Sequence, residues 1–342
     1  MIIASVGSFR SLIVRASAAL ALAGGLALAT SVASGQADAA GGGGQPPVVV
    51  EIDPNWINTL PPGEWCGTHQ RYIAELVARG INPPDGVCPQ DGPCDDPVNR
   101  NAAIPTGGTP IKTYRLSIHV FCQNDGSNCA ATLADVDAAV VALNALYLPW
   151  RIQFNYDTNF INSTKYRTLS PSEERGMKRA YADSPATKLN VYVVNTGGVC
   201  WGTFPWGQNA LTKQGGIVMH ERWFAVDTAV FTHEVGHCLG LWHTFHGVSE
   251  VTPCGQCYEL AGRTPDQGDV TGDRCSDTVP TPRNSTCSDP GGNDFCNNVP
   301  WGPTDLLNYM AYSCLYSQNE FTEHQAGRMH CWTTAILTGW LR

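Results

Sequence analysis

The sequence predicts an α/β fold in which a regular, sheet-containing half precedes an irregular half. Three observations predict it. Strand-like and helix-like patterns follow one another from residue 112 to 240, regular patterns then fade into Gly, Pro, Asp and Cys after residue 243, and one helical pattern closes the chain at 322–341. The sequence contains no internal repeat.

The regular half is expected to open as strand, helix, strand, because apolar residues alternate, then recur at helical spacing, then alternate again. A polar helix, two short strands and a further helix follow. The expected elements lie, in this order, at 114–121, 133–146, 150–156, 172–182, 188–194, 216–220 and 227–240.

The N-terminus has the pattern of a secretory signal peptide, residues 1–39. Arg10 and Arg15 precede an apolar stretch, 16–33, and small residues follow, with Ala-Asp-Ala at 37–39 as one cleavage site and positions 34 and 35 as others. A membrane anchor is the alternative, but the stretch is Ala-rich and shorter than the ~20 apolar residues that a span needs. The sequence therefore predicts a secreted protein.

Two segments have the composition of linkers. Residues 40–48 form a Gly- and Pro-containing leader, and 83–110 is rich in Pro, Gly, Asp and Asn. A short helix is expected between them, at about 66–79.

Charge and cysteine content limit the classes of partner. The formal net charge of −9 argues against nucleic acid or an anionic membrane surface as partner. Fourteen cysteines in an exported chain predict disulfides. The CxxC pair Cys254 and Cys257 is therefore expected to be disulfide-bonded rather than to bind a second zinc, and Cys122 and Cys129 are expected to close a hairpin.

Residues 233–243 read His-Glu-Val-Gly-His-Cys-Leu-Gly-Leu-Trp-His, and this string has the spacing of a zinc site. On a helix, His233 and His237 project from one face, four residues apart, and Glu234 lies beside them. Gly240 permits the positive φ of a sharp turn, which brings His243 back as third ligand. The alternative, satisfied polar histidines at helical spacing, does not account for all five positions.

Three neutral imidazoles leave Zn²⁺ a fourth position for water. The expected chemistry is hydrolysis, with Glu234 as general base for the water.

The histidine string with its glycine resembles the metzincin zinc endopeptidases, whose second mark is a methionine turn, matched here by Leu-Asn-Tyr-Met-Ala-Tyr at 307–312. Further stretches resemble the pappalysin family, which includes ulilysin-like enzymes. These stretches are Thr-Phe at 244–245, Gly-Asp-Arg-Cys-Ser-Asp-Thr at 272–278, Gly-Thr-Phe-Pro-Trp at 202–206, Phe-Thr at 321–322 with Gln325 and Arg328-Met329, and Cys-Gly-Thr-His at 66–69.

The resemblance implies a pro-segment and linker at 40–104 and a catalytic domain at 105–342, divided into upper and lower parts at Gly240. The upper part is expected to hold a twisted sheet and two long helices. By the same resemblance, Met310 forms a hydrophobic base beneath the metal, Tyr312 stabilises the oxyanion of the reaction, and Cys287 pairs with Cys314.

The resemblance also implies a structural calcium ion held by Asp273, Asp277 and Thr278. Carboxylates are the hard oxygen ligands that calcium prefers. The loop departs from the family pattern at Cys275 and Val279, and a solvated acidic loop is the alternative.

Cys66 implies latency, because a thiolate can fill the fourth position of the zinc. The alternative is a disulfide from Cys66 to Cys88 or Cys94, although Cys88 and Cys94 are close enough in sequence to pair with each other. Arg100, in the linker, is the expected activation cleavage site, since exposed linkers are readily cut.

The sequence thus predicts a secreted, monomeric zinc endopeptidase that is made as a latent zymogen and acts on protein or peptide substrates. An inactive binding protein of the same fold is one alternative, and a zinc hydrolase of non-peptide substrates is the other. The first usually loses the glutamate or a ligand histidine, and neither is lost here.

Overall fold

The computed structural model describes residues 49–81, 92–224 and 229–342, all within one compact unit, Pro46–Arg342. The expected signal peptide at 1–39, the leader at 40–48 and Cys88 lie outside the described residues.

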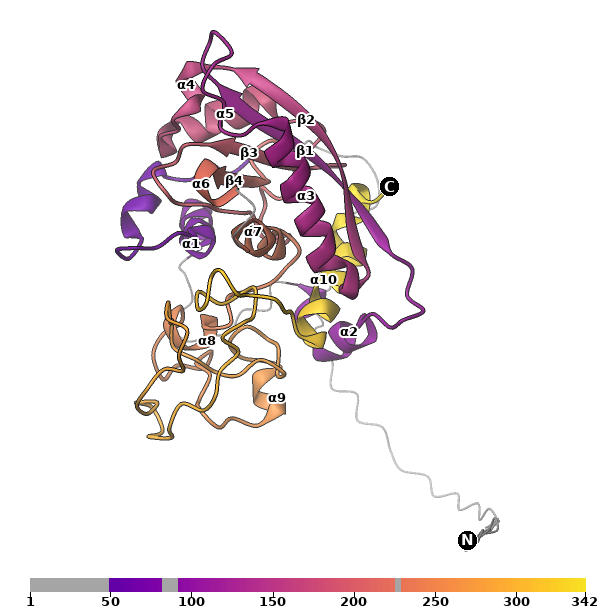
Figure 1. Ribbon diagram of the computed structural model, residues 1–342. Coiled ribbons are helices and arrows are strands. Elements are labelled where there is room, and N and C mark those ends of the chain that lie inside the picture. Colours follow the sequence, from indigo (N-terminus) through magenta and orange to yellow (C-terminus); the bar gives the residue numbers. More distant parts are fainter. Residues whose placement is uncertain (1–48, 82–91, 225–228) are drawn as a thin grey trace, which may run out of the picture. The chain divides into compact units, whose positions relative to one another are not determined.

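A four-stranded parallel sheet forms the upper half of the unit (Figure 1). Its strands are β1 (Lys112–Cys122), β2 (Ile152–Asn162), β3 (Leu189–Val194) and β4 (Ile217–His220), in the order β2-β1-β3-β4. The central strands β1 and β3 are buried almost throughout, as parallel strands covered on both faces are. The edge strand β2 is exposed along much of its length.

Helices cover both faces of the sheet. Alternate side chains of β1, among them Ile118, pack with α3 (Leu133–Tyr147) and α7 (Val230–Cys238). On the opposite face, Phe121 packs with α5 (Glu174–Tyr181) and with the short helix η1 (Pro54–Thr59). The capping box of Thr132 and Asp135 explains why α3 begins where it does.

Among the described residues, Leu133–Trp150 is long and apolar enough to cross a membrane, with a mean hydropathy of 1.2. This segment contains α3, which packs on the sheet with its buried side chains Val136, Val140 and Leu143. Core helices of soluble proteins have the same composition.

The lower half has little regular structure, as the sequence predicts. It contains the four-residue helices α8 (His246–Ser249) and α9 (Pro265–Gly268), and it leads into α10 (Glu323–Ala335). The predicted closing helix at 322–341 is thus shorter, because the backbone at Ile336 turns away (φ −133°) before a 3₁₀ turn, η5 (Leu337–Trp340).

The residues before β1 belong to the same unit. They form α1 (Thr68–Ala78), η2 (Pro93–Asp95) and α2 (Pro97–Ala102), and α2 and η2 both contact α10. The remaining short elements are η3 (Leu148–Trp150), α4 (Thr164–Arg167), η4 (Pro171–Glu173) and α6 (Glu221–Phe224).

Candidate metal centre and active site

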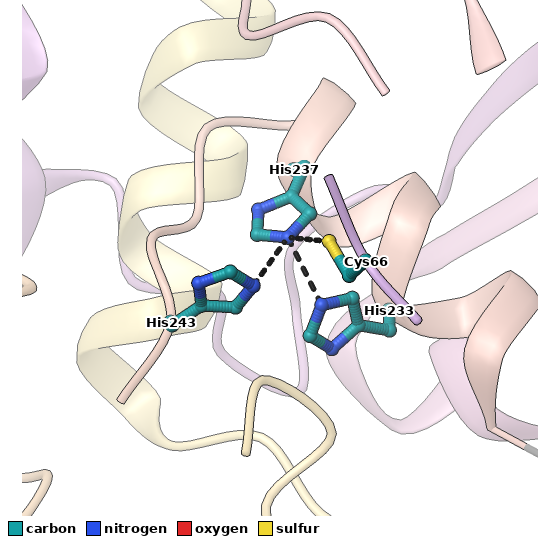
Figure 2. Close-up of side chains that lie close together, drawn as sticks. All are labelled: Cys66, His233, His237 and His243. Carbon is teal, nitrogen blue, oxygen red and sulfur yellow. Dashed lines mark hydrogen bonds between the residues drawn. The ribbon is translucent and has the colours of Figure 1, made fainter. Parts of the chain in front are cut away.

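Helix α7 presents His233 and His237 from adjacent turns of one face, so that their Nε2 atoms lie 3.0 Å apart. The chain turns at Gly240, which has a φ of +101° and would clash with the Trp332 indole if it carried a Cβ. This turn returns His243, whose Nε2 lies 3.1 Å from that of His237 (Figure 2). All three imidazoles are fully buried.

Each of the three imidazoles donates its Nδ1 proton to an oxygen. The acceptors are the carbonyl oxygens of Tyr309 and Leu241 and the carboxylate of Glu250, at 2.7, 2.7 and 2.8 Å from His233, His237 and His243 respectively. A neutral imidazole that donates through Nδ1 has only a lone pair at Nε2. The lone pairs of His233 and His243 therefore each face that of His237 at about 3 Å, an arrangement that a cation between them stabilises. The residues present thus fit a zinc ion.

The thiol of Cys66 completes this group. Its Sγ lies 3.4 Å from Nε2 of His237, and the four donor atoms lie within 4.8 Å of one another (Figure 2). Burial, and next the charge of Glu234, raise the pKa of the Cys66 thiol well above 9, so that a thiolate here needs a cation beside it. One cysteine and three histidines are a typical closed tetrahedral zinc set.

Glu234 is fully buried beside the histidines, and burial raises the pKa of its carboxyl to about 8. Its Oε2 accepts a hydrogen bond of 2.9 Å from the Thr68 hydroxyl, and its Oε1 has no hydrogen-bond partner among the described residues. The carboxylate is therefore oriented by a residue that precedes the sheet.

Residues 65–67 lie along the active site as a short paired segment, just before α1 begins at Thr68. Cys66 forms a parallel bridge with Cys200, in which Cys200 N donates to Trp65 O at 2.7 Å and Gly67 N donates to Cys200 O at 2.8 Å. The Trp65 ring packs on His233, with 4.7 Å between ring centroids. This backbone pairing is the manner in which an extended peptide adds to a strand edge.

Tyr312 and Met310 also pack beside the histidines and the helix that carries two of them. The Tyr312 hydroxyl donates to the carbonyl oxygen of Cys66 at 3.2 Å, and its ring centroid is 5.0 Å from that of His243. Met310 is fully buried, and a Cβ added to Gly236 on α7 would lie 2.6 Å from its Sδ. The thioether therefore packs directly against the helix that carries two of the histidines.

Glu250 is a site residue that the sequence analysis missed. It is the C-cap of α8, is almost fully buried, and accepts from His243 through Oε1 and from His246 through Oε2, at 2.8 and 3.0 Å. The only sequence feature that could have indicated Glu250 is its spacing of four residues from His246, because residues at this spacing share a helix face.

Two of the three predicted calcium ligands, Asp273 and Thr278, are in contact, whereas Asp277 has a different hydrogen-bond partner. The carboxylate of Asp273 accepts from the Thr278 hydroxyl at 2.9 and 3.0 Å, whereas Asp277 accepts from the backbone N–H of His324 at 2.8 Å. The carbonyl oxygen of Thr278 accepts from Arg263 at 2.9 Å.

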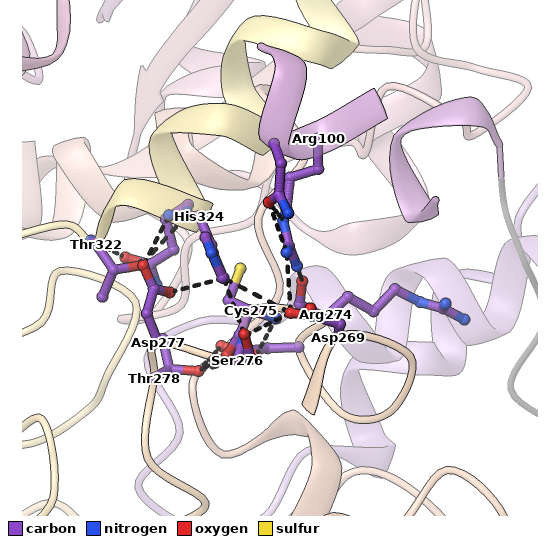
Figure 3. A network of polar contacts seen from close by, with 12 residues as sticks. Arg100, Asp269, Arg274, Cys275, Ser276, Asp277, Thr278, Thr322 and His324 are labelled. Carbon is purple, nitrogen blue, oxygen red and sulfur yellow. Dashed lines mark hydrogen bonds and ion pairs between the residues drawn. The ribbon is translucent and has the colours of Figure 1, made fainter. Parts of the chain in front are cut away.

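The environment of Arg100 corrects one prediction. Arg100 is not in an exposed linker: it lies in α2, is 1% exposed, pairs with Asp269 at 2.9 Å and donates to the carbonyl oxygen of Arg274 at 2.6 Å (Figure 3). The Pro-, Asn- and Gly-rich composition was misleading because Asp96 caps a short helix there. A protease cannot reach the Arg100 side chain in this form.

The disulfides correct a second prediction. Cys94 pairs with Cys331 rather than with Cys88, because η2 lies against α10. The expected pairs Cys122–Cys129 and Cys287–Cys314 are formed. Cys254 of the CxxC pair bonds Cys296, and the free cysteines among the described residues are Cys66, Cys200, Cys238 and Cys275.

Comparison with known proteins agrees with this fold and site. The chain is 30% identical over 239 residues to an extracellular metalloprotease of Arthroderma otae. The aligned region covers 66% of this chain and 77% of the relative. It is 36% identical over 164 residues to human Pappalysin-1, which covers 45% of this chain and 10% of the relative, so the chain spans about a tenth of that protein's length.

Solved structures support the fold assignment. Tannerella forsythia promirolysin superposes with a TM-score of 0.52 at 20% identity, over 69% of this chain and 84% of that chain. Mirolysin superposes with a TM-score of 0.50, also at 20% identity, over 65% of this chain and 91% of that chain. Fold and histidine site together define a metallopeptidase of the metzincin class.

A family model described as pregnancy-associated plasma protein-A, peptidase M43, matches residues 179–333. The chain therefore belongs to the pappalysin family of metallopeptidases.

Proposed function

We propose that this protein is a secreted zinc endopeptidase that is made as a latent zymogen. One observation carries the proposal: the Cys66 thiol meets the three histidines at one point, while Thr68, two residues later, bonds the carboxylate of Glu234. A single short segment thus blocks both the fourth position of the metal and the general base.

Zinc, when bound by the three histidines, supplies Lewis acidity and lowers the pKa of a water ligand toward about 7. Glu234 accepts the proton of the attacking water and passes it to the leaving amine, a role supported by its unpartnered Oε1. The Tyr312 hydroxyl, which here donates to a main-chain carbonyl, donates to the developing oxyanion of a substrate.

Contacts along α1 support the assignment of this segment as an inhibitory pro-segment. Arg71 is buried and pairs with Glu174 at 3.2 Å, and it also donates to Gln214 O at 3.1 Å. Glu75 accepts from the backbone N–H of Gln208 at 2.6 Å. These bonds hold α1 across the active site, so removal of the segment requires a cut in the chain.

The cut that activates the enzyme must fall between Cys66 and Cys94. A cut after Cys94, at Arg100 for example, leaves the pro-segment attached to α10 through the Cys94–Cys331 disulfide. Arg79 lies within the required interval, at the C-cap of α1, and is exposed. The proposed activation cleavage site is therefore Arg79 and no longer Arg100.

Secretion is supported by the signal pattern of residues 1–39, by the disulfides, and by relatives named extracellular metalloproteases. Structural calcium in the lower half is proposed only for the acidic loop 269–278, where either calcium or the Arg263 guanidinium, which donates to Thr278 O at 2.9 Å, takes the role of counter-charge to Asp273. Addition of calcium to the calcium-free protein should raise its melting temperature. An unchanged value assigns that role to Arg263.

The proposal is tested by digestion of a peptide library with the activated protein. Zinc-dependent cleavage that a chelator abolishes is expected, and the Glu234→Gln variant is the matched control. Hydrolysis of esters or amides with no peptide cleavage would favour the non-peptide hydrolase, and zinc binding without any hydrolysis would favour the inactive binding protein.

A further inference from the structure

A second group of metal-binding side chains lies beside the active site. His69 comes from α1, whereas His246 and Glu250 come from α8 and its C-cap. One donor atom from each residue lies within 4.8 Å of the other two. We propose that these three residues bind a second zinc ion, which bridges the pro-segment and the catalytic domain in the latent protein.

The distances in the group suit a tetrahedral metal. Oε2 of Glu250 lies 3.8 Å from Nδ1 of His69 and 3.0 Å from Nδ1 of His246, where a bound metal would replace the proton that His246 otherwise donates to Glu250. Ligand atoms about 2.0–2.1 Å from a tetrahedral zinc are roughly 3.4 Å apart, which falls between the two values.

The state of His69 is the independent observation that points to a ligand. Its Nδ1 is buried and has no hydrogen-bond partner among the described residues, although the side chain is directed at Glu250. The residue is 9% exposed, so little solvent is available to satisfy this nitrogen. An unsatisfied buried ring nitrogen costs stability that a metal bond recovers.

The nearby arginine, Arg283, does not occupy the position proposed for the metal. Glu250 uses its other oxygen, Oε1, for His243 and for Arg283 at 4.0 Å, and Arg283 is itself paired with Glu64 at 3.0 Å. The repulsive arginine therefore lies on the opposite oxygen of the carboxylate. Stacking on Trp242, with 4.1 Å between ring centroids, fixes the His246 ring.

Two imidazoles and one carboxylate are a known zinc set that leaves a fourth position for water. Because His69 belongs to the segment that activation removes, the second ion is lost with it. This inference rests on the proposed function in one respect, that residues 66–79 are a pro-segment. Zinc binding by the three residues in the full-length chain does not depend on proteolysis.

The test is zinc content measured by elemental mass spectrometry. It uses the full-length Glu234→Gln chain, which cannot digest itself, after dialysis against low micromolar Zn²⁺. About two zinc ions per chain are expected, and about one in His69→Ala, His69→Gln and His246→Ala. His220→Ala, at the end of β4, is the matched control and should retain about two.

The two zinc sites are separated by a catalytic-ligand variant. His237→Ala should lose one ion and keep the one at His69. If His69→Gln and His246→Ala bind as much zinc as the parent, the second site is absent and the three residues form a hydrogen-bonded group only. If instead His237→Ala loses no zinc, the proposed catalytic centre fails while the second site stands.

A thermal measurement covers the case in which a variant folds poorly. Zinc added to chelator-treated full-length protein should raise the melting temperature further in the parent than in His69→Gln. Equal increases in both proteins would overturn the second site.

Discussion

Cys94 is disulfide-bonded to Cys331, 237 residues further along the chain. The bond joins η2 to the buried face of α10, where Arg328 also pairs with Asp95 at 2.8 Å. The residues just before β1 are thereby tied to α10, and a cut after Cys94 leaves the preceding chain attached through this bond.

This bond predicts where activation occurs. The mature protein should begin between residues 67 and 94, and Arg79→Gln should slow activation by a protease that cuts after arginine. N-terminal sequencing of the active form measures this. A mature N-terminus after residue 100, with the pro-segment released under non-reducing conditions, would contradict the assignment.

Arg100→Ala should act on stability and not on activation. The change leaves Asp269 without its arginine and removes the bond to Arg274 O, at a cost of about 3 kcal/mol in the free energy of unfolding. Chemical denaturation of the full-length chain measures the loss. The exposed Arg79→Ala variant is the control and should unfold as the parent does.

Cys66→Ala should raise the activity of the uncleaved chain. The thiol no longer fills the metal's fourth position, although Arg71 and Thr68 still hold the segment, so activity below that of the mature enzyme is expected. Cys275→Ala, which removes a buried free thiol outside the site, should stay latent. A Cys66→Ala chain as inactive as the parent would make steric blocking of the cleft the better account.

Glu234→Gln should retain zinc and lose catalysis. The histidine ligands are unchanged, but the amide cannot accept a proton, so kcat should fall by at least ~10²-fold. Steady-state kinetics on the activated variant, with zinc content measured in the same sample, checks this. A near-normal kcat would overturn the assignment of the base.

Attachment of the pro-segment should weaken in acid. Burial alone would raise the pKa of Glu174, but the charges of Arg71 and Lys178 lower it from 4.5 to about 2. The group therefore contributes stability that is fully present above pH 4.5 and is lost as pH falls toward 2, with a total of about 3 kcal/mol.

The matched comparison is the difference in unfolding free energy between the full-length chain and its Glu174→Gln variant, both in the Glu234→Gln background. This difference should shrink from pH 5 to pH 2. A difference that stays constant over this range would mean that the ion pair of Arg71 and Glu174 does not support the docked segment.

The sequence predicted the parts of the fold that depend on local pattern. Strands β1 and β3 and helix α3 fall where alternating or helical spacing placed them; α3 buries Val136, Val140 and Leu143 at helical spacing, whereas β1 and β3 are buried on both faces. The convergence of the three histidines was equally predictable, since His233 and His237 share a helix face and Gly240 marks the turn that brings back His243.

Features that depend on contacts distant in sequence could not be predicted in this way. No sequence feature near Cys94 predicts that it pairs with Cys331. The polar residues around Arg100 are typical of an exposed linker, although the Arg100 guanidinium pairs with Asp269 inside the protein. Glu250 was missed for the same reason, because its role is defined by the position of His243 after the chain has turned.

The central claim is that the Cys66 sulfur binds the catalytic zinc in the latent protein. X-ray absorption at the zinc edge of the full-length His69→Ala, Glu234→Gln chain, whose single zinc is the catalytic one, tests it most directly. The account predicts one sulfur at about 2.3 Å and three nitrogens at about 2.0–2.1 Å. A spectrum with nitrogen and oxygen neighbours only would contradict it.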